Sequence, residues 1–361
     1  MTLRTKSRGQ SSGSGSQQLF VSSDSHVVED PDLWVKRLPP ALRERAPLFP
    51  PLEVGGHFQG APGGNDPNKR LEEMAVDGVS AEVLYPSFAM ELYAIEDPAL
   101  QEACFRAFND WLIEYCSAAP DRLIGIGTIS TYDIDQAVLE LERCRKMGLR
   151  GGLVWLAPRP DLPFTSDHYE RFWAAAQDLD MPVSFHTVTG FGVTKNGVWY
   201  LPRIEQARFA AMETVAEGER ALFDIVMSGV LDRHPRLKLV LVENELGWLP
   251  YFLQNWDKSV QRWRRADSQS LPISLLPSEY FQRQIYATFL NDRAGGQALS
   301  WWGQDNCMWS SDYPHHSTTW PNSREIIAKE LGHLPRGVRN KIVYENVARL
   351  YSLGLQQGEE E

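Results

Sequence analysis

The chain has 361 residues, of which 47 are Asp or Glu and 36 are Lys or Arg, so its formal net charge is −11 at pH 7. Hydrophobic residues make up 43% of the sequence and charged residues 23%, a balance typical of a folded globular protein rather than a disordered one. The acidic excess argues against a nucleic-acid-binding protein, which needs a basic surface to meet phosphates. No uncharged apolar run is long enough to cross a bilayer, so we expect no membrane segment.

The ends of the chain and its cysteines bear on where the protein works. Residues 1–18 are rich in Ser, Gly, Gln and Lys and contain no apolar stretch, which predicts a flexible tail rather than a secretory signal. Residues 19–355 are expected to form a single domain, followed by an acidic C-terminal tail over 356–361. The four cysteines are scattered with no CxxC spacing, which predicts free thiols and a cytoplasmic protein.

In chain order, eight short apolar runs alternate with longer amphipathic stretches. Each run is bounded by Gly, Pro or polar residues, as strands buried on both faces should be. The predicted strands are 19–23, 81–85, 123–129, 151–156, 181–186, 237–242, 285–288 and 306–310. The stretches between them, such as 98–119, 133–147 and 168–179, predict helices. This alternation indicates an α/β fold built of parallel βαβ units. Because no Gly-rich phosphate fingerprint follows the first strand, a closed (β/α)8 TIM barrel is favoured over a doubly wound sheet.

Two connections are longer than is usual in a compact domain. Residues 30–68 are rich in proline, and residues 187–221 follow the fifth strand and contain several glycines. Both leave the carboxyl ends of strands, where barrel enzymes place their active sites, so we expect them to be long lid loops. Residues 331–355 predict a final helix that packs back on the barrel.

Polar residues that suit metal binding end four of the predicted strands. The first strand runs into Asp24 and His26, which point the same way because alternate residues of an extended segment share a face. The fifth, sixth and eighth strands end at His186, Glu243 and Asp312. If the barrel closes, these side chains meet at one rim, where the carboxylates alone would repel one another. A divalent cation removes that repulsion, and a mixed His and carboxylate set suits zinc, iron or manganese. A metal site is therefore predicted at the strand C-terminal ends.

A series of short motifs carries a family resemblance. In order, these motifs are Asp24-Ser25-His26-Val27-Val28-Glu29, Asp77-Gly78-Val79, Leu84-Tyr85-Pro86, Val183-Ser184-Phe185-His186, His234-Pro235-Arg236-Leu237, Glu243 with Gly247-Trp248-Leu249-Pro250, Ser311-Asp312-Tyr313-Pro314-His315 and Lys341-Ile342-Val343-Tyr344-Glu345-Asn346. As an ordered set they resemble the amidohydrolase superfamily, in the amidohydrolase-related branch that contains aminocarboxymuconate-semialdehyde decarboxylase. The set is specific for the family and not for one reaction.

The resemblance implies a (β/α)8 barrel with metal at the carboxyl ends of its strands. The family pattern is HxH after strand one, His after strand five, often His after strand six, and Asp after strand eight. By that pattern Asp24, His26, His186 and Asp312 are metal ligands. This sequence departs from it at two positions, because Asp24 stands for the first His and Glu243 for the strand-six His. The two changes make the ligand set harder and more anionic, for one or two ions of zinc or iron, with Glu243 as an acid/base or as a ligand.

The resemblance also implies a metal-dependent hydrolase or lyase that acts on a small organic molecule, with no organic cofactor. In hydrolysis, Asp312 would take a proton from a metal-activated water and pass it to the leaving group, with Glu243 assisting. In non-oxidative decarboxylation, an acid would protonate the substrate carbon. The two reactions stay open at this point. His315 is a candidate to orient Asp312 or to donate to a substrate oxygen, and Glu29 to bind metal or to accept from an imidazole N–H.

A second hypothesis is a non-haem di-iron monooxygenase on the same barrel, which would hydroxylate a bulky apolar substrate of the natural-product type. It rests on the carboxylate-rich ligand set, since such sets hold two irons in other proteins, and on the 12 tryptophans and long loops. A third possibility, a catalytically silent barrel used for binding, would require the ligands to be lost. The expected partners are a small-molecule substrate and a second copy of the chain in a homodimer, with no nucleic acid or membrane.

Overall fold

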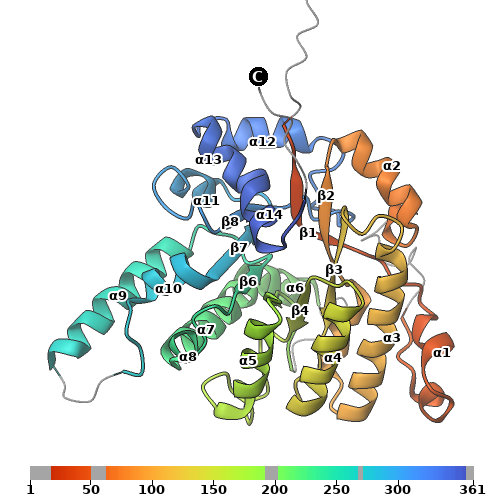
Figure 1. The fold of residues 1–361 in the computed structure, drawn as a ribbon. Helices are drawn as coiled ribbons and strands as arrows, with labels where there is room; N and C mark the ends of the chain where they lie inside the picture. Colours follow the sequence, from red (N-terminus) through yellow and green to blue (C-terminus); the bar gives the residue numbers. More distant parts are fainter. Residues whose placement is uncertain (1–17, 50–61, 192–201, 267–270, 355–361) are drawn as a thin grey trace, which may run out of the picture.

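The computed structural model describes residues 18–49, 62–191, 202–266 and 271–354. In them, eight parallel strands form one sheet in the order β1 to β8, which curls into a barrel with helices around it (Figure 1). The predicted (β/α)8 barrel is thereby confirmed. The tails predicted over 1–18 and 356–361 lie outside the described residues apart from Gln18, and the division into one domain and two tails stays a prediction.

All eight predicted strands are present, with bounds that differ by a few residues. They are β1 (Val21–His26), β2 (Ala81–Tyr85), β3 (Leu123–Thr128), β4 (Gly151–Val154), β5 (Val183–His186), β6 (Leu239–Val242), β7 (Ile285–Phe289) and β8 (Cys307–Trp309). Every residue of these strands is buried, because one face meets the interior of the barrel and the other meets the helices. This double burial explains why the strands read as short apolar runs.

Helices cover the outside of the barrel (Figure 1). They are α1 (Leu33–Arg37), α2 (Pro67–Asp77), α3 (Pro98–Cys116), α4 (Ile134–Lys146), α5 (Glu170–Asp178), α6 (Arg203–Arg208), α7 (Thr214–Met227), α8 (Val230–Arg233), α9 (Leu249–Ala266), α10 (Pro277–Gln284), α11 (Arg293–Ala298), α12 (Ser323–Leu331), α13 (Arg336–Asn340) and α14 (Asn346–Leu350). Local chemistry sets several of their starts. The carboxylates of Asp66, Asp97 and Asp133 accept hydrogen bonds from backbone N–H groups in the first turns of α2, α3 and α4.

The structure corrects three predictions, two about long loops and one about the final helix. Residues 30–68 are not one loop, since α1 and the 3-10 turns Pro40–Arg45 and Pro62–Gly64 lie within them. Residues 187–221 are helical from Arg203 onward, because good helix formers there outweigh the glycines before them. The remaining parts of both segments, 50–61 and 192–201, lie outside the described residues.

The third correction concerns the final helix predicted over 331–355. Leu331 instead ends α12, and the next helix begins at Arg336 after Pro335, because a proline disfavours helical geometry in the residue before it. A π-helical turn, Lys341–Glu345, then separates α13 from α14, which ends at Leu350.

The barrel closes between β8 and β1 by a few hydrogen bonds, without a paired ladder in the described part of the chain. We call this junction the β1–β8 seam. The Asp312 N–H donates to the Asp24 carbonyl at 3.0 Å, and the His26 N–H donates to the Tyr313 carbonyl at 2.6 Å. The Ser23 hydroxyl donates to the Trp309 carbonyl at 2.9 Å. Two residues of the predicted metal set, Asp24 and Asp312, are thus joined directly through their backbones.

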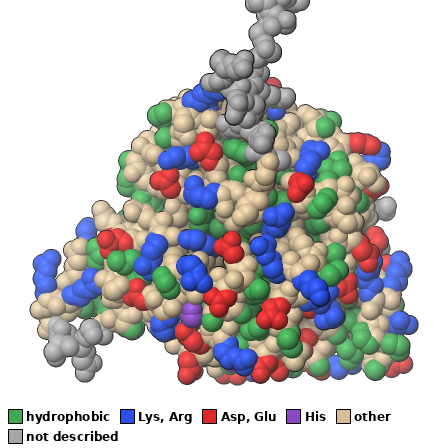
Figure 2. All heavy atoms as spheres, in the orientation of Figure 1, with side chains coloured by type: hydrophobic (Ala, Val, Ile, Leu, Met, Phe, Trp, Pro, Cys, Tyr) green, Lys and Arg blue, Asp and Glu red, His purple; other side chains and the backbone are tan. Residues whose placement is uncertain are grey.

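The surface agrees with the balance of charges in the sequence. Acidic and basic side chains are interspersed over the face shown in Figure 2. Among the helices that the structure describes, none has the length and apolar character to cross a membrane. All four cysteines are free and buried, as small apolar residues often are.

Candidate metal centre

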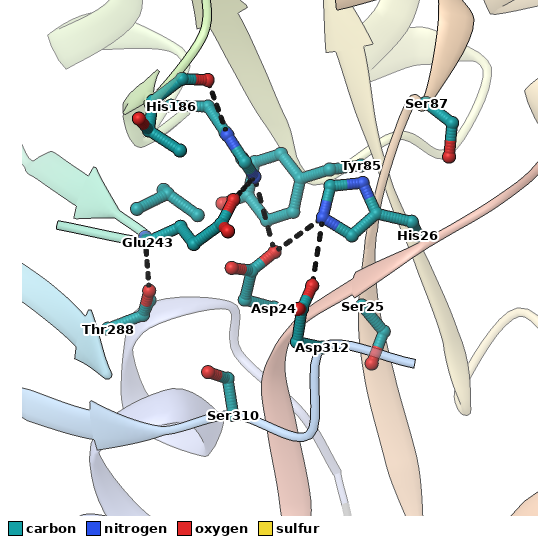
Figure 3. A network of polar contacts seen from close by, with 12 residues as sticks. Asp24, Ser25, His26, Tyr85, Ser87, His186, Glu243, Thr288, Ser310 and Asp312 are labelled. Carbon is teal, nitrogen blue, oxygen red and sulfur yellow. Dashed lines mark hydrogen bonds and ion pairs between the residues drawn. The ribbon is translucent and has the colours of Figure 1, made fainter. Parts of the chain in front are cut away.

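The five residues predicted to bind metal lie at the carboxyl ends of four different strands. Asp24 and His26 belong to β1, His186 is the last residue of β5, Glu243 directly follows β6, and Asp312 follows β8 by three residues. Figure 3 shows their side chains directed toward one another from the surrounding strands. The structure therefore brings together groups that are up to 288 residues apart in the sequence (312 − 24).

The distances show how small the shared space is. His26 Nε2 lies 3.6 Å from Asp24 Oδ1 and 3.4 Å from Asp312 Oδ1. His186 Nε2 lies 3.5 Å from the same Asp24 oxygen and 3.7 Å from Glu243 Oε2. Ligand atoms of Asp24, His26, His186 and Glu243 all lie within 4.8 Å of one another. This arrangement is tight enough for one cation to touch several of the side chains at once.

Both histidines present the same ring nitrogen to this space. His26 Nδ1 lies 2.8 Å from the Pro86 carbonyl oxygen, and His186 Nδ1 lies 2.9 Å from the Thr187 carbonyl oxygen. A carbonyl oxygen only accepts hydrogen bonds, so each Nδ1 carries the proton and donates it. The lone pair of each neutral ring is therefore on Nε2, the atom that faces the carboxylates. Backbone acceptors commonly orient metal-binding histidines in this way.

Several buried atoms of the cluster have no hydrogen-bond partner among the described residues. They are both carboxylate oxygens of Asp24, the Nε2 atoms of His26 and His186, and Asp312 Oδ1. Buried polar groups normally find a partner, because leaving one unpaired costs about 1–3 kcal/mol. A divalent cation would satisfy all of these atoms together, and imidazole nitrogens with carboxylate oxygens suit zinc, manganese or iron. The residues therefore fit the predicted metal.

Two of the carboxylate residues adopt a backbone conformation that is uncommon for residues other than glycine. Glu243 has φ 55° and Asp312 has φ 54°, both in the left-handed region. The Glu243 N–H donates to the Thr288 hydroxyl at 2.9 Å, and the Ser317 hydroxyl donates to Asp312 Oδ2 at 2.7 Å. Strained residues of this kind persist only where the surroundings hold them, and they concentrate at functional sites.

The charges of the cluster act on one another. Burial lowers the pKa of His186, but Asp24 and Glu243 outweigh it and raise that pKa to about 9. Burial, together with the charges of Asp312 and Asp24, raises the pKa of Glu243 well above its ordinary value. Burial also acts to raise the pKa of Asp312, but the neighbouring His315 and His26 rings lower it below its ordinary value. The surroundings therefore move the pKa values of Glu243 and Asp312 in opposite directions.

His315, predicted as a catalytic residue, lies beside the cluster. Its ring centroid is 4.2 Å from that of His26, and ligand atoms of His26, Asp312 and His315 lie within 4.8 Å of one another. Burial is the largest influence on its pKa, which is lowered to about 4. Because His26 Nδ1 is committed to the Pro86 carbonyl, His26 has a single nitrogen to offer. It cannot serve separate ions in the two overlapping groups.

Glu29, another residue considered from the sequence, is used differently. Its carboxylate accepts hydrogen bonds from the backbone N–H groups of Ser87, Phe88 and Ala89, so it caps the 3-10 turn after β2. Sequence reasoning missed the supporting carbonyls of Pro86 and Thr187, which leave no sequence signal because every residue has a carbonyl.

Comparison with known proteins places the chain in a family. It matches the amidohydrolase family over residues 25–353 and therefore belongs to that family. Gamma-resorcylate decarboxylase from Rhizobium sp. (strain MTP-10005) is 26% identical over 298 residues, which cover 79% of this chain and 86% of the relative.

Two solved structures illustrate the likeness of the fold. Dihydroxybenzoic acid decarboxylase from Polaromonas sp. JS666, with bound manganese and the inhibitor 2-nitroresorcinol, has a TM-score of 0.68 at 22% identity, covering 94% of this chain and 98% of its own. 5-Carboxyvanillate decarboxylase from Novosphingobium aromaticivorans DSM 12444, complexed with manganese and 4-hydroxy-3-methoxy-5-nitrobenzoic acid, has a TM-score of 0.70 at 18% identity, covering 94% and 98%. At such identities the likeness shows the fold alone.

Proposed function

We propose that this member of the amidohydrolase family is a divalent-metal-dependent lyase that removes a carboxyl group, without oxidation, from a small aromatic carboxylic acid. The observation that carries the proposal is the buried set of imidazole nitrogens and carboxylate oxygens that face one another and find no hydrogen-bond partner in the part of the chain that the structure describes. The names of the relatives support the reaction class, since those reported above are decarboxylases and two of the structures contain manganese.

In this proposal Asp24, His26, His186 and Asp312 hold the metal, and Glu243 faces it from the end of β6. A third of the Glu243 side chain is exposed, whereas Asp24 and both histidines are fully buried, so Glu243 is the member of the cluster that an incoming substrate can reach. A divalent cation held there would supply the positive charge that binds and orients the acidic oxygens of the substrate.

Glu243 is the proposed proton donor. Decarboxylation breaks the bond between the substrate carbon and the carboxyl group, which leaves as CO2, and the electron pair stays on the carbon. That carbon then takes a proton from the Glu243 carboxyl group, the member of the cluster that the substrate can reach. Asp312, whose pKa is lowered, orients the site together with the neighbouring His315 ring.

The finer predictions from the sequence remain proposals. Hydrolysis through a metal-activated water would use the same residues, with Asp312 as the base, and we place it second because the relatives reported above are lyases by name. The narrower resemblance to aminocarboxymuconate-semialdehyde decarboxylase, the preference for zinc or iron, and the homodimer also stay predictions.

The test is an assay of CO2 release by the full chain purified without chelator, after its metals have been counted by elemental analysis. 2,6-Dihydroxybenzoate and 5-carboxyvanillate serve as probes, with and without oxygen. We expect CO2 release in the absence of oxygen, loss of release on chelation, and recovery with Mn2+. Glu243→Gln should lower the rate by about 100-fold or more while Mn2+ still binds. No release from any hydroxybenzoate in the metal-loaded protein would contradict the proposal.

The di-iron monooxygenase is the candidate from a different enzyme class, and one observation favours it. The cluster holds three carboxylates, and His315 adds a further imidazole within 4.8 Å of ligand atoms of His26 and Asp312. The same experiment separates the two functions. Two irons per chain, together with oxygen uptake in the presence of an apolar aromatic substrate, would support the oxygenase, whereas one metal and oxygen-independent turnover would exclude it.

A further inference from the structure

Arg70 is fully buried in the barrel wall, which is rare for an arginine. It lies on α2, and its Nε donates to Glu82 Oε2 on β2 in a short contact between two buried side chains. Its guanidinium also stacks 4.4 Å above the centre of the Tyr313 ring. A buried ion pair of this kind is weak evidence for stability, because removing both charges from water costs about as much as their attraction returns. Its contacts therefore need another explanation.

Two further guanidinium contacts go to the β1–β8 seam, besides one at 3.5 Å to the Gly63 carbonyl oxygen. Nη1 donates to the backbone carbonyl of His26 at 2.8 Å, and Nη2 lies 3.5 Å from the carbonyl oxygen of Tyr313. His26 is a proposed metal ligand, and Tyr313 directly follows Asp312, which is another. The two backbones also meet each other, since the His26 N–H donates to the Tyr313 carbonyl. One planar side chain thus contacts both sides of the seam beside two proposed ligands.

The other carboxylate oxygen of Glu82 contacts a residue of the same seam. Glu82 Oε1 accepts from the Ser25 hydroxyl at 3.4 Å. Ser25 lies between Asp24 and His26 and points to the opposite face of β1, because successive residues of a strand alternate. The Ser25 hydroxyl lies 3.0 Å from that of Ser311 and 2.9 Å from that of Ser22, so three serines connect β1 with the segment after β8. Along β1, the pairing with β2 shifts register between Ser22 and Ser25.

We infer that Arg70 and Glu82 are positioning residues of the proposed metal site: their buried ion pair holds the β1–β8 seam at the spacing that lets His26 and Asp312 share one cation. The seam has no ladder of its own in the described residues, so only a few backbone hydrogen bonds hold it and side chains must support this spacing. The inference rests on the metal binding that the proposed function requires. It also leaves Arg70 unavailable as a contact for the substrate, since the guanidinium is buried and paired.

The experiment measures metal binding by the metal-stripped full chain, with Mn2+ followed by electron paramagnetic resonance and Co2+ by its visible absorption. Arg70→Lys keeps the positive charge opposite Glu82 but loses the planar fork that also reaches His26 and Tyr313. The double variant Arg70→Met with Glu82→Met removes both charges, so neither is left buried alone. The matched control is Arg143→Lys on α4, which alters a partly buried arginine paired with Glu140 and Asp110.

We expect Mn2+ to bind about tenfold or more weakly to both Arg70 variants, as for other changes just outside a metal site, and the Co2+ spectrum to change. The control should lose some thermal stability and keep the wild-type affinity and spectrum. If Arg70→Lys does not fold, the Mn2+ affinity and Co2+ spectrum of the double variant test the inference. Wild-type Mn2+ affinity and an unchanged Co2+ spectrum in a folded Arg70 variant would overturn the inference, as would equal weakening in the control. A wild-type chain that binds neither ion would overturn the proposed metal site itself.

Discussion

Asp24 stands where the family pattern has a histidine, and this one residue changes the charge of the whole cluster. Its Oδ1 lies 3.6 Å from His26 Nε2 and 3.5 Å from His186 Nε2, so it is the group that both imidazoles face. With Glu243 and Asp312 it brings the number of clustered carboxylates to three. An imidazole that binds metal is neutral and cannot balance that charge, so removal of Asp24 should reduce the attraction for a divalent cation.

At this scale we expect Asp24→Ala to lower the affinity for Mn2+ by about 100-fold or more, since changes even outside the ligand shell cost about 10–100-fold. The measurement is a Mn2+ titration of the metal-stripped chain, supported by elemental analysis of the protein as purified. Glu29→Gln is the matched control, because Glu29 is also a buried carboxylate at the end of β1 but binds backbone N–H groups instead. Equal metal content in wild type and Asp24→Ala would show that the ligand assignment is wrong.

Among the elements, α7 shows how close packing creates an unusual carboxyl group. Gly218 allows α7 to approach the end of β6, since a Cβ there would meet Asn244 Oδ1 at 2.1 Å. The close packing of α7 also buries Oε2 of the neighbouring Glu217, which has no hydrogen-bond partner among the described residues. Burial, helped by the charge of Glu213, raises the pKa of Glu217 to about 7. The ionised form of Glu217 is therefore disfavoured by the fold.

This shift predicts a pH-dependent stability. The folded-state pKa of Glu217 lies above the ordinary 4.5. What its neutral carboxyl group contributes to the free energy of unfolding is therefore fully present below pH 4.5. That stability is lost as the pH rises through 7 and the buried group ionises. We expect Glu217→Gln to stabilise the protein by about 1 kcal/mol at pH 8, a figure reduced for solvent screening, and by much less at pH 5. Urea unfolding at the two pH values measures the difference. Glu142→Gln on the exposed face of α4 is the control, and an equal effect at both pH values would contradict the prediction.

Packing of helices on strands supplies a second test at the level of elements. Gly127 lies in β3, and a Cβ at this position would meet Cys144 Sγ of α4 at 2.8 Å and Leu149 Cδ1 at 3.1 Å. Gly127→Ala should therefore push α4 away from the barrel and destabilise the protein by about 1–3 kcal/mol, as overpacked cores do. Thermal unfolding measures the change. Gly337→Ala on α13 is the control, because a Cβ there meets nothing within 4 Å and should change stability little. Gly148→Ala is not used, because the positive φ of Gly148 would strain an alanine.

In the whole molecule, the cluster exists only when the barrel is closed. Its side chains come from β1, β5 and the segments after β6 and β8, so an unfolded chain cannot present them together. A cation that binds the closed barrel and not the unfolded chain stabilises the fold by mass action. Metal binding and folding stability are therefore linked through the β1–β8 seam.

From this linkage we expect Mn2+ to raise the melting temperature of the metal-stripped chain. At a free concentration 100 times the dissociation constant, the gain is about 2.7 kcal/mol, or about 4 °C for a domain of this size. Differential scanning calorimetry with Mn2+ and with Mg2+ measures the effect and its selectivity. Asp24→Ala should abolish most of the Mn2+ shift. A shift of the same size in that variant would mean that the ion binds elsewhere.

Local sequence patterns predicted the barrel and the side chains that the structure gathers at its rim. Buried parallel strands must be short and apolar and must alternate with amphipathic helices, so all eight strands are visible in local patterns, and the polar residues that end β1, β5, β6 and β8 follow from them. The carboxyl ends of parallel strands share one rim, which is why Asp24, His186 and Asp312 could be expected to meet. These are consequences of periodicity and chain order alone.

The direction of each side chain at that rim depends on the tertiary structure. Glu29 follows β1 as closely as the cluster residues do, yet it caps the turn at Ser87 because that is where unpaired N–H groups lie. The left-handed backbone of Glu243 and the burial of Arg70 against the β1–β8 seam likewise depend on contacts between distant segments. Local sequence specifies periodicity and capping, whereas the direction of a side chain after a strand is set by whichever partner the closed barrel brings within reach.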